Sequence, residues 1–233
     1  MSEKNMEHAT TVEKDPLLEV ENVWSKYQKP VLSIAGILIV VVGGWFGYNK
    51  FIKEPNDLKA ADEIYHIQEF FAKDSSRKVI DGDGTVKGAL SFISKYGGTP
   101  SANLAHYYAG ISYLKLGEFS KAVDHLKEFN TSAKQVQIVA SGALGDAYSE
   151  LGKKDEAIES YKKAASVFVK DEALSAEYLF RAAALTETMG KSKEALELYK
   201  SIKEKFPTSD KARTVDKYIY RLSVEPNDLS IGK

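Results

Sequence analysis

The hexapeptide Gly-Glu-Phe-Ser-Lys-Ala at residues 117–122 decides the fold, because two variants of it follow further along the chain. These are Gly-Lys-Lys-Asp-Glu-Ala at 152–157 and Gly-Lys-Ser-Lys-Glu-Ala at 190–195, so the three glycines lie 35 and 38 residues apart. A repeat of this period is typical of stacked helical hairpins, in which no unit buries its apolar face without a neighbour. The sequence therefore predicts an all-α solenoid, an architecture that binds other molecules far more often than it catalyses reactions.

Each unit follows the residue pattern of the tetratricopeptide repeat (TPR), in which a small residue is followed by an aromatic residue, glycine, alanine and a large residue. In the middle unit these positions are Gly145, Tyr148, Gly152, Ala157 and Tyr161. Small residues let the two helices approach closely, and the glycine takes the left-handed conformation between them. The last unit departs from the pattern at Thr186, where an aromatic residue is usual. We expect three TPR units over residues 101–209.

Composition narrows the classes of function. From residue 53 onward the basic and acidic residues are equal in number, with no long run of one sign. Nucleic-acid binding needs a concentrated positive surface and is therefore not expected. Cysteine is absent, which excludes thiol catalysis, disulfides and thiolate metal sites. No proline interrupts residues 101–206, as uninterrupted helices require.

One segment predicts a single-pass membrane helix. Residues 31–47 carry no charge and are rich in valine, leucine and isoleucine, and with the residues up to Ile52 they are long enough to span a bilayer. We place this helix at residues 30–52. Lysines and aromatic residues flank it on both sides, as membrane-interface anchors do: Trp24, Lys26, Tyr27, Lys29, Trp45, Tyr48, Lys50 and Lys53. Residues 49–53 offer no small residues for cleavage, so we interpret the segment as an uncleaved anchor.

The ends of the anchor leave two questions open. Residues 1–29 are expected to form a tail, in which residues 16–29 are either a helix lying on the membrane surface or a plain linker. Two lysines precede the span and three follow it closely, so the positive-inside rule does not decide its orientation. Gly43 and Gly47 have the spacing that lets another transmembrane helix pack closely, although glycine is common in such helices.

Two further helical segments are expected between the anchor and the repeats. Residues 53–60 predict a short polar neck with Pro55 as a helix stop signal. Up to residue 100 there follow a helix over about 58–72 and a helix over about 86–96, which together make a degenerate first hairpin. Residues 210–233 predict a capping helix with one charged face, followed by a tail.

Candidate chemistry is sparse. Asp81-Gly-Asp-Gly-Thr85 resembles the phosphoryl-accepting motif of haloacid-dehalogenase-like phosphatases, but that chemistry needs a parallel sheet, which the helical pattern excludes. A calcium loop would need an acidic residue where Phe92 stands. A tight turn is the preferred interpretation. The histidines have no pair at helical spacing: they are His8, His66, His106 and His125. We expect no catalytic residue, no metal, no cofactor and no small-molecule substrate.

The inner face of a repeat stack, lined by its first helices, is the usual ligand surface. Aligning the units places six candidate protein-binding residues there: Tyr107, Ile111, Asp146, Glu177, Phe180 and Glu187. Gly142 and Ala184 fall at equivalent positions. Such a mixed, mildly acidic surface with aromatic residues is typical of binding to an extended or partly unfolded polypeptide. The alternative is that Tyr107 and Phe180 simply pack between helices.

Three features carry a resemblance to a known family. They are Trp-Phe-Gly-Tyr-Asn-Lys-Phe at 45–51, the Asp-Gly-Asp-Gly loop, and Tyr-Tyr-Ala-Gly-Ile-Ser-Tyr-Leu-Lys-Leu-Gly at 107–117. With them the chain resembles membrane-anchored TPR proteins of Bacteroidota, which are in turn similar to the YfgM-type ancillary subunit of the bacterial Sec (SecYEG) translocon. The resemblance implies a cytoplasmic N-terminus, an inner-membrane anchor beside the translocon and periplasmic repeats, with no catalytic residues.

The leading hypothesis is a non-enzymatic adaptor whose partners are Sec translocon subunits, a periplasmic chaperone or emerging client polypeptides. The alternative is an organelle outer-membrane protein-import receptor with cytosolic repeats. Accessibility of the repeats to protease in intact cells or organelles distinguishes the two.

Overall fold

The structure is a computed structural model that describes residues 16–224. The chain divides into two compact units, Met1–Pro55 and Asn56–Lys233, and each is described by itself. Within the described residues all regular structure is helical, apart from one isolated bridge between Gly82 and Lys87. The predicted all-α class is therefore confirmed.

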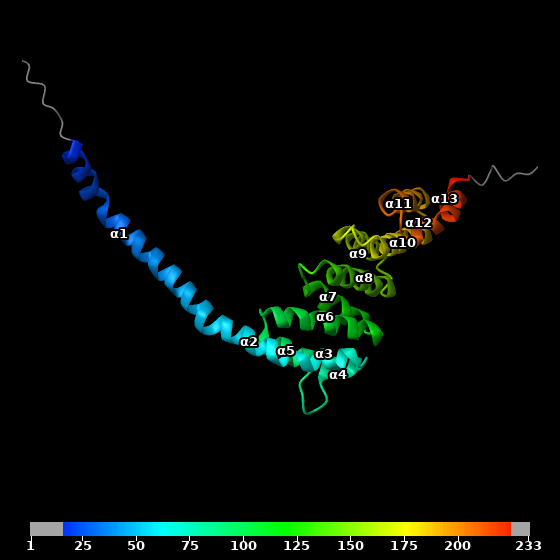
Figure 1. Cartoon of the computed structure of the whole chain (residues 1–233), viewed down its shortest axis with the longest axis horizontal. Coiled ribbons are helices and arrows are strands. Elements are labelled where there is room, and N and C mark those ends of the chain that lie inside the picture. Colours follow the sequence, from blue (N-terminus) through cyan, green and yellow to red (C-terminus); the bar gives the residue numbers. More distant parts are fainter. Residues whose placement is uncertain (1–15, 225–233) are drawn as a thin grey trace, which may run out of the picture. The chain divides into compact units, whose positions relative to one another are not determined.

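One long helix makes up most of the first unit. α1 (Pro16–Tyr48) runs through 33 residues without a break, and η1 (Asn49–Lys53) adds a π-helical turn (Figure 1). The large apolar side chains of α1 from Val31 onward are exposed, and Val40 is 74% accessible. In the described chain one helical stretch, Lys26–Ala72, is long and apolar enough to cross a membrane, and none of its most apolar window is buried. By length and composition, this helix is a candidate membrane span.

The backbone before the apolar segment differs from both alternatives that the sequence left open, a surface-lying helix and a plain linker. Residues 16–29 form the first turns of α1, and the helix continues through Pro30 instead of turning there. A proline removes one backbone hydrogen bond, but within a long helix the neighbouring turns hold the direction of the chain. The structure thus shows one continuous rod where the sequence suggested two segments.

The expected neck is helical as well. The Glu54 N–H donates to the carbonyl of Asn49, five residues back, and the chain passes directly into α2 (Glu54–Glu63). Pro55 was expected to stop the helix, and that prediction is wrong. A π-helical turn widens the backbone where the proline ring would otherwise meet a carbonyl, so the helical path survives.

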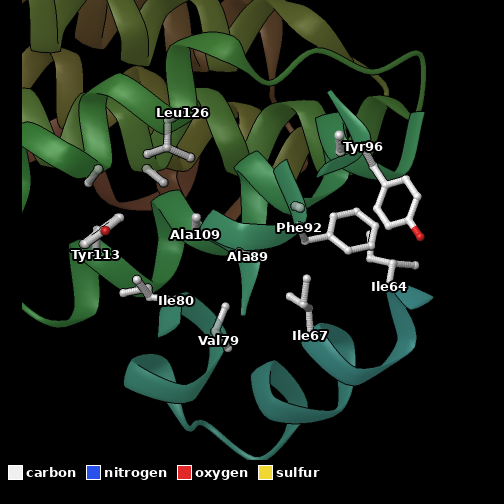
Figure 2. Packing of buried hydrophobic residues seen from close by; sticks show 14 of the residues in the cluster. Ile64, Ile67, Val79, Ile80, Ala89, Phe92, Tyr96, Ala109, Tyr113 and Leu126 are labelled. Carbon is white, nitrogen blue, oxygen red and sulfur yellow. The ribbon is translucent and has the colours of Figure 1, made fainter. Parts of the chain in front are cut away.

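Three short helices build the first layer of the second unit. They are α3 (Tyr65–Ala72), α4 (Ser76–Asp81) and α5 (Ala89–Tyr96). The sequence predicted α3 and α5 but missed α4, which is too short to show a helical period. Val79 and Ile80 of α4 are fully buried, and Figure 2 shows them converging with Ile67 of α3 and Phe92 of α5. The degenerate hairpin is therefore a layer of packed helices.

Three helical hairpins follow in chain order, as Figure 1 shows. They are α6 (Pro100–Lys115) with α7 (Phe119–Glu128), α8 (Lys134–Glu150) with α9 (Lys154–Val167), and α10 (Glu172–Thr188) with α11 (Ser192–Lys205). Gly117, Gly152 and Gly190 lie between the paired helices at φ of +75°, +72° and +74°. L side chains rarely adopt this conformation, so the predicted left-handed caps are confirmed.

Close packing within each hairpin depends on small residues opposite large ones. A Cβ added to Gly110 would lie 2.6 Å from Cγ of Leu126, and one added to Gly145 would lie 2.6 Å from the ring of Tyr161. Real side chains do not approach so closely, so glycine is what lets α6 meet α7 and α8 meet α9 at these points. This is the small-to-large pairing that the repeat pattern predicts.

The C-terminal cap consists of two helices, where one was expected. α12 (Asp210–Thr214) and α13 (Asp216–Ser223) meet at the fully buried Val215, and both pack on α11. The core behind the helices has two clusters of buried residues, one on each side of α8, and Tyr148 packs against both. The second unit is thus a continuous stack in which each hairpin buries its neighbour's apolar face.

Candidate protein-binding surface

The inner side of the stack is formed by the first helices of the hairpins. Direct contacts join α6 to α8 and α8 to α10, whereas α7 and α9 each pack between successive first helices. The first helices therefore make the more closely spaced row, which is the concave side of a curved repeat stack. All six candidate binding residues lie on α6, α8 or α10.

The C-terminal half of this side carries an ionic network. Asp146 on α8 accepts a hydrogen bond from the Tyr161 hydroxyl at 2.7 Å and another from Nη1 of Arg181 at 2.8 Å. Nε of Arg181 donates to Glu177 at 2.9 Å, and Nζ of Lys211 lies 3.0 Å from the other oxygen of Glu177. We call these five residues the ionic network; they join α8, α9, α10 and α12.

The protonation states fit this arrangement. Burial, together with the hydrogen bond to Asp146, raises the pKa of Tyr161 above its usual range, so the hydroxyl remains a donor. Burial works against ionisation of Glu177, but hydrogen bonds from Arg181 and Lys211 outweigh it and hold the pKa of Glu177 below its ordinary value of 4.5. Glu177 is therefore ionised at neutral pH, opposite the cationic Arg181.

The remaining two candidates on α10 are also engaged. Glu187 accepts a hydrogen bond from the Tyr199 hydroxyl at 3.1 Å and pairs with Arg221 of α13. The centre of the Phe180 ring lies 5.6 Å from the centre of the Tyr199 ring and 4.2 Å from Nζ of Lys211. Each candidate carboxylate on the inner side thus has a cationic partner, and the expectation of a mildly acidic surface is corrected to one of balanced charge.

Gly142 also differs from its expected role. A Cβ at this position would lie 2.0 Å from the ring of Tyr178, so Gly142 is the point where α10 rests on α8. The same ring makes a cation–π contact with Arg181, whose Cζ lies 5.4 Å from the ring centre. The position aligns with ligand-facing ones in other repeats, but here it holds two helices together.

The N-terminal half of the inner side is aromatic. The Tyr107 ring lies 5.1 Å from that of Phe129 and 6.2 Å from that of Phe71, while Tyr108 lies 4.8 Å from Phe71. Ile111, one turn along α6, packs partly exposed against the same core. We call these five residues the aromatic region. Burial raises the pKa of Tyr107 and of Tyr108, as expected for half-covered phenol groups without an ionic partner.

The Asp-Gly-Asp-Gly-Thr motif is a turn between α4 and α5. Asp83 accepts backbone hydrogen bonds from Thr85 at 3.0 Å and Val86 at 2.9 Å, which lower the pKa of its carboxyl group. Asp81 lies 3.8 Å from Arg77. A carboxylate that closes its own turn is a structural group, so the preferred interpretation of this motif matches its geometry.

One pair of residues escaped the sequence analysis. His106 of α6 and His125 of α7 lie with their Nδ1 atoms 3.1 Å apart. Sequence spacing along a single helix could not reveal them, because they come from opposite arms of one hairpin. The available signal was their position on either side of the turn, 11 residues before and 8 residues after Gly117.

The glycines of the membrane segment leave open space beside α1. A Cβ added to Gly43 or Gly47 would meet nothing within 4 Å. This is compatible with close packing of another transmembrane helix, which stays a prediction.

Comparison with known proteins supports the repeat assignment. Tetratricopeptide-repeat family models match residues 104–132, 140–167 and 177–209. These three matches fall on the hairpins α6/α7, α8/α9 and α10/α11. A comparison with curated proteins gives no match. The chain therefore carries three tetratricopeptide repeats arranged as an α-solenoid.

Proposed function

We propose that the chain is a non-enzymatic adaptor that is anchored in a membrane by α1 and binds protein partners with the inner side of its repeats. The observation that carries the proposal is the pairing of a fully exposed apolar helix with a repeat stack on one chain. Exposed apolar side chains on this scale are stable in lipid and not in water. Tetratricopeptide repeats generally bind proteins, which supports the second half of the proposal.

The membrane anchor is supported by energetics as well as geometry. The ten valine, leucine, isoleucine and phenylalanine residues within residues 31–47 together favour insertion by roughly 3 to 6 kcal/mol on a scale of translocon insertion. Trp24 and Tyr27 before this segment, and Trp45 and Tyr48 at its end, are all at least half exposed. Amphipathic rings at both ends of an apolar helix are typical of the two lipid–water interfaces.

We place the partner on the aromatic region. Tyr107 and Ile111 present partly covered apolar surface and no paired charge, so a ligand gains burial there without breaking an ion pair. In the ionic network, by contrast, a ligand must compete with Arg181 and Lys211 for their carboxylates. An extended polypeptide with apolar side chains fits the aromatic region best.

The cellular setting is a finer proposal, supported by the sequence resemblance. We place the N-terminus in the cytoplasm, the anchor in a bacterial inner membrane beside the Sec translocon, and the repeats in the periplasm. The partners are then translocon subunits, a periplasmic chaperone or chains emerging from the translocon.

Topology is tested by labelling single cysteines introduced near Ser2 and Lys233 in intact cells. The chain has no cysteine of its own, so any label reports only the introduced site. We expect an impermeant maleimide to label the residue near Lys233 and to spare the one near Ser2. The reverse pattern would reject periplasmic repeats and favour the import-receptor alternative, in which the repeats face the cytosol.

Partner binding is tested by co-purification from detergent-solubilised membranes. We expect translocon subunits or a periplasmic chaperone to co-purify with the wild-type chain and to be reduced at least tenfold by Tyr107→Ala. The matched control is Tyr220→Ala, which removes a tyrosine that is 73% exposed on the terminal helix α13. If neither kind of partner is recovered with the wild-type chain, the translocon proposal is wrong.

A further inference from the structure

The two helices of the first hairpin bring a pair of histidines together. His106 lies on α6 and His125 on α7, and their Nδ1 atoms are 3.1 Å apart. The ring of Tyr113 stacks on that of His125 at 5.4 Å, with 21° between the planes, and so restrains its orientation. Two imidazole nitrogens thus meet from separate helices at a fixed separation.

This separation is the one that two nitrogen ligands of a single metal ion adopt. Zinc binds imidazole nitrogen at about 2.0 to 2.1 Å, so two such ligands lie about 2.9 Å apart at a right angle and about 3.3 Å apart at a tetrahedral angle. The observed 3.1 Å falls between these values. Imidazole is a favoured ligand for zinc, copper and nickel.

The surroundings of the pair also suit a cation. A cavity of about 270 Å³ beside the rings is lined by His106, Asp124, His125, Lys127 and Glu128. The negative charge of Glu128 acts on both imidazoles. The two carboxylates outweigh the single lysine, so the cavity attracts a positive ion and has room for water ligands.

We propose that His106 and His125 bind a late first-row divalent metal ion, such as Zn²⁺, through their Nδ1 atoms. No set of three histidine or acidic ligands is preassembled within residues 16–224, so the imidazoles supply two ligands and water, with Glu128 beside them, completes the shell. Without metal, one Nδ1–H donates to the other ring. On binding, that proton moves through solvent to Nε2 of the same ring, and both imidazoles stay neutral.

The metal ion would join α6 to α7 and stabilise the first tetratricopeptide hairpin. A metal ion that binds the folded state and not the unfolded state raises the melting temperature, and the rise grows with the logarithm of the free metal concentration. This property does not depend on the adaptor function, because neither histidine is one of the six candidate binding residues.

The test is equilibrium dialysis of the full chain against ZnCl₂, in detergent and without a histidine tag, with metal measured by mass spectrometry. We expect one Zn²⁺ per chain at micromolar free metal. His106→Asn and His125→Asn should each weaken binding at least tenfold. Asparagine places an amide near the former Nδ1, which preserves packing but removes a good metal ligand.

The matched control is His66→Asn, which removes a histidine that lines a different cavity, and it should leave binding unchanged. A second measurement does not depend on whether the variants fold. Zn²⁺ should raise the melting temperature of the wild-type chain, and a chelator should reverse the rise. Substoichiometric binding to the wild type, or equal loss in the His66 variant, overturns the proposal.

Discussion

The aromatic region and the ionic network occupy the same side of one repeat stack, yet they differ in what their side chains have already bound. In the ionic network Arg181 donates hydrogen bonds to Glu177 at 2.9 Å and to Asp146 at 2.8 Å. In the aromatic region Tyr107 and Phe71 contact other rings and remain partly open. This contrast supports our proposal that the ionic network holds the stack together and that the aromatic region binds a partner.

We expect the largest effect on stability from a substitution that overpacks the contact between α8 and α10, beside the ionic network. Gly142→Ala adds a Cβ 2.0 Å from the buried Tyr178 ring, which cannot move without losing its contact with Arg181. We expect a loss of about 1 to 3 kcal/mol in the free energy of unfolding, measured by urea titration of the full chain in detergent. Gly44→Ala, where the added Cβ meets nothing within 4 Å, is the control. Equal stability of both variants would show that Gly142 is not a packing contact.

The next effect separates binding from stability. Tyr107→Ala should weaken partner binding at least tenfold, or about 1.4 kcal/mol, because it removes the central ring of the aromatic region. Arg181→Gln should change partner binding less than threefold while lowering stability. Binding is measured by quantitative co-purification, and folding by circular dichroism at 222 nm. If the Arg181 variant loses more binding than the Tyr107 variant, the roles of the two halves are reversed.

A smaller effect tests one bond of the ionic network. Tyr161→Phe removes the hydroxyl that donates to Asp146 at 2.7 Å while the ring still fills the space beside Gly145. We expect a loss of about 0.5 to 1.5 kcal/mol in unfolding free energy, by urea titration. Tyr220→Phe removes an exposed hydroxyl and should change stability very little. An equal loss in the two variants would mean that the bond to Asp146 adds nothing.

The smallest effect concerns pH. The folded-state pKa of Glu177 lies below its ordinary 4.5, so its ionised form stabilises the fold above that pH and the contribution is lost as the pH falls through the folded-state pKa. Because Glu177 is about one-third exposed (34%), we expect well under about 1 kcal/mol. Urea titrations between pH 6 and pH 3 should show a shallower decline for Glu177→Gln. An unchanged slope would contradict an ionised Glu177 within the network.

The repeat period predicted the hairpins because their geometry is local. Gly117, Gly152 and Gly190 can be identified from sequence, since each must adopt a left-handed conformation next to a helix end. The inner-side positions of Asp146, Glu177 and Glu187 were likewise placed on first helices by alignment. For these residues the sequence pattern agrees with the structure, because their positions depend on only one helix and the turn beside it.

What the sequence missed depends on contacts between elements. α4 is six residues long and is held by the burial of Val79 and Ile80, so no period reveals it. Pro55 predicts a break only if the preceding turn is an ordinary α-helix, and here that turn is π-helical. His106 and His125 come from two different helices, and so do Asp146 and its cationic partner Arg181. A pattern along one helix cannot reveal such contacts.

Site-specific photocrosslinking in intact membranes tests the central claim most directly. A benzophenone amino acid replaces Tyr107 in one chain and Tyr220 of α13 in another, and adducts are identified by mass spectrometry. The account predicts a defined polypeptide adduct from position 107 and none from position 220. A chain that gives no adduct from position 107, or the same adducts from both positions, would contradict the claim that the aromatic half of the repeats binds a protein partner.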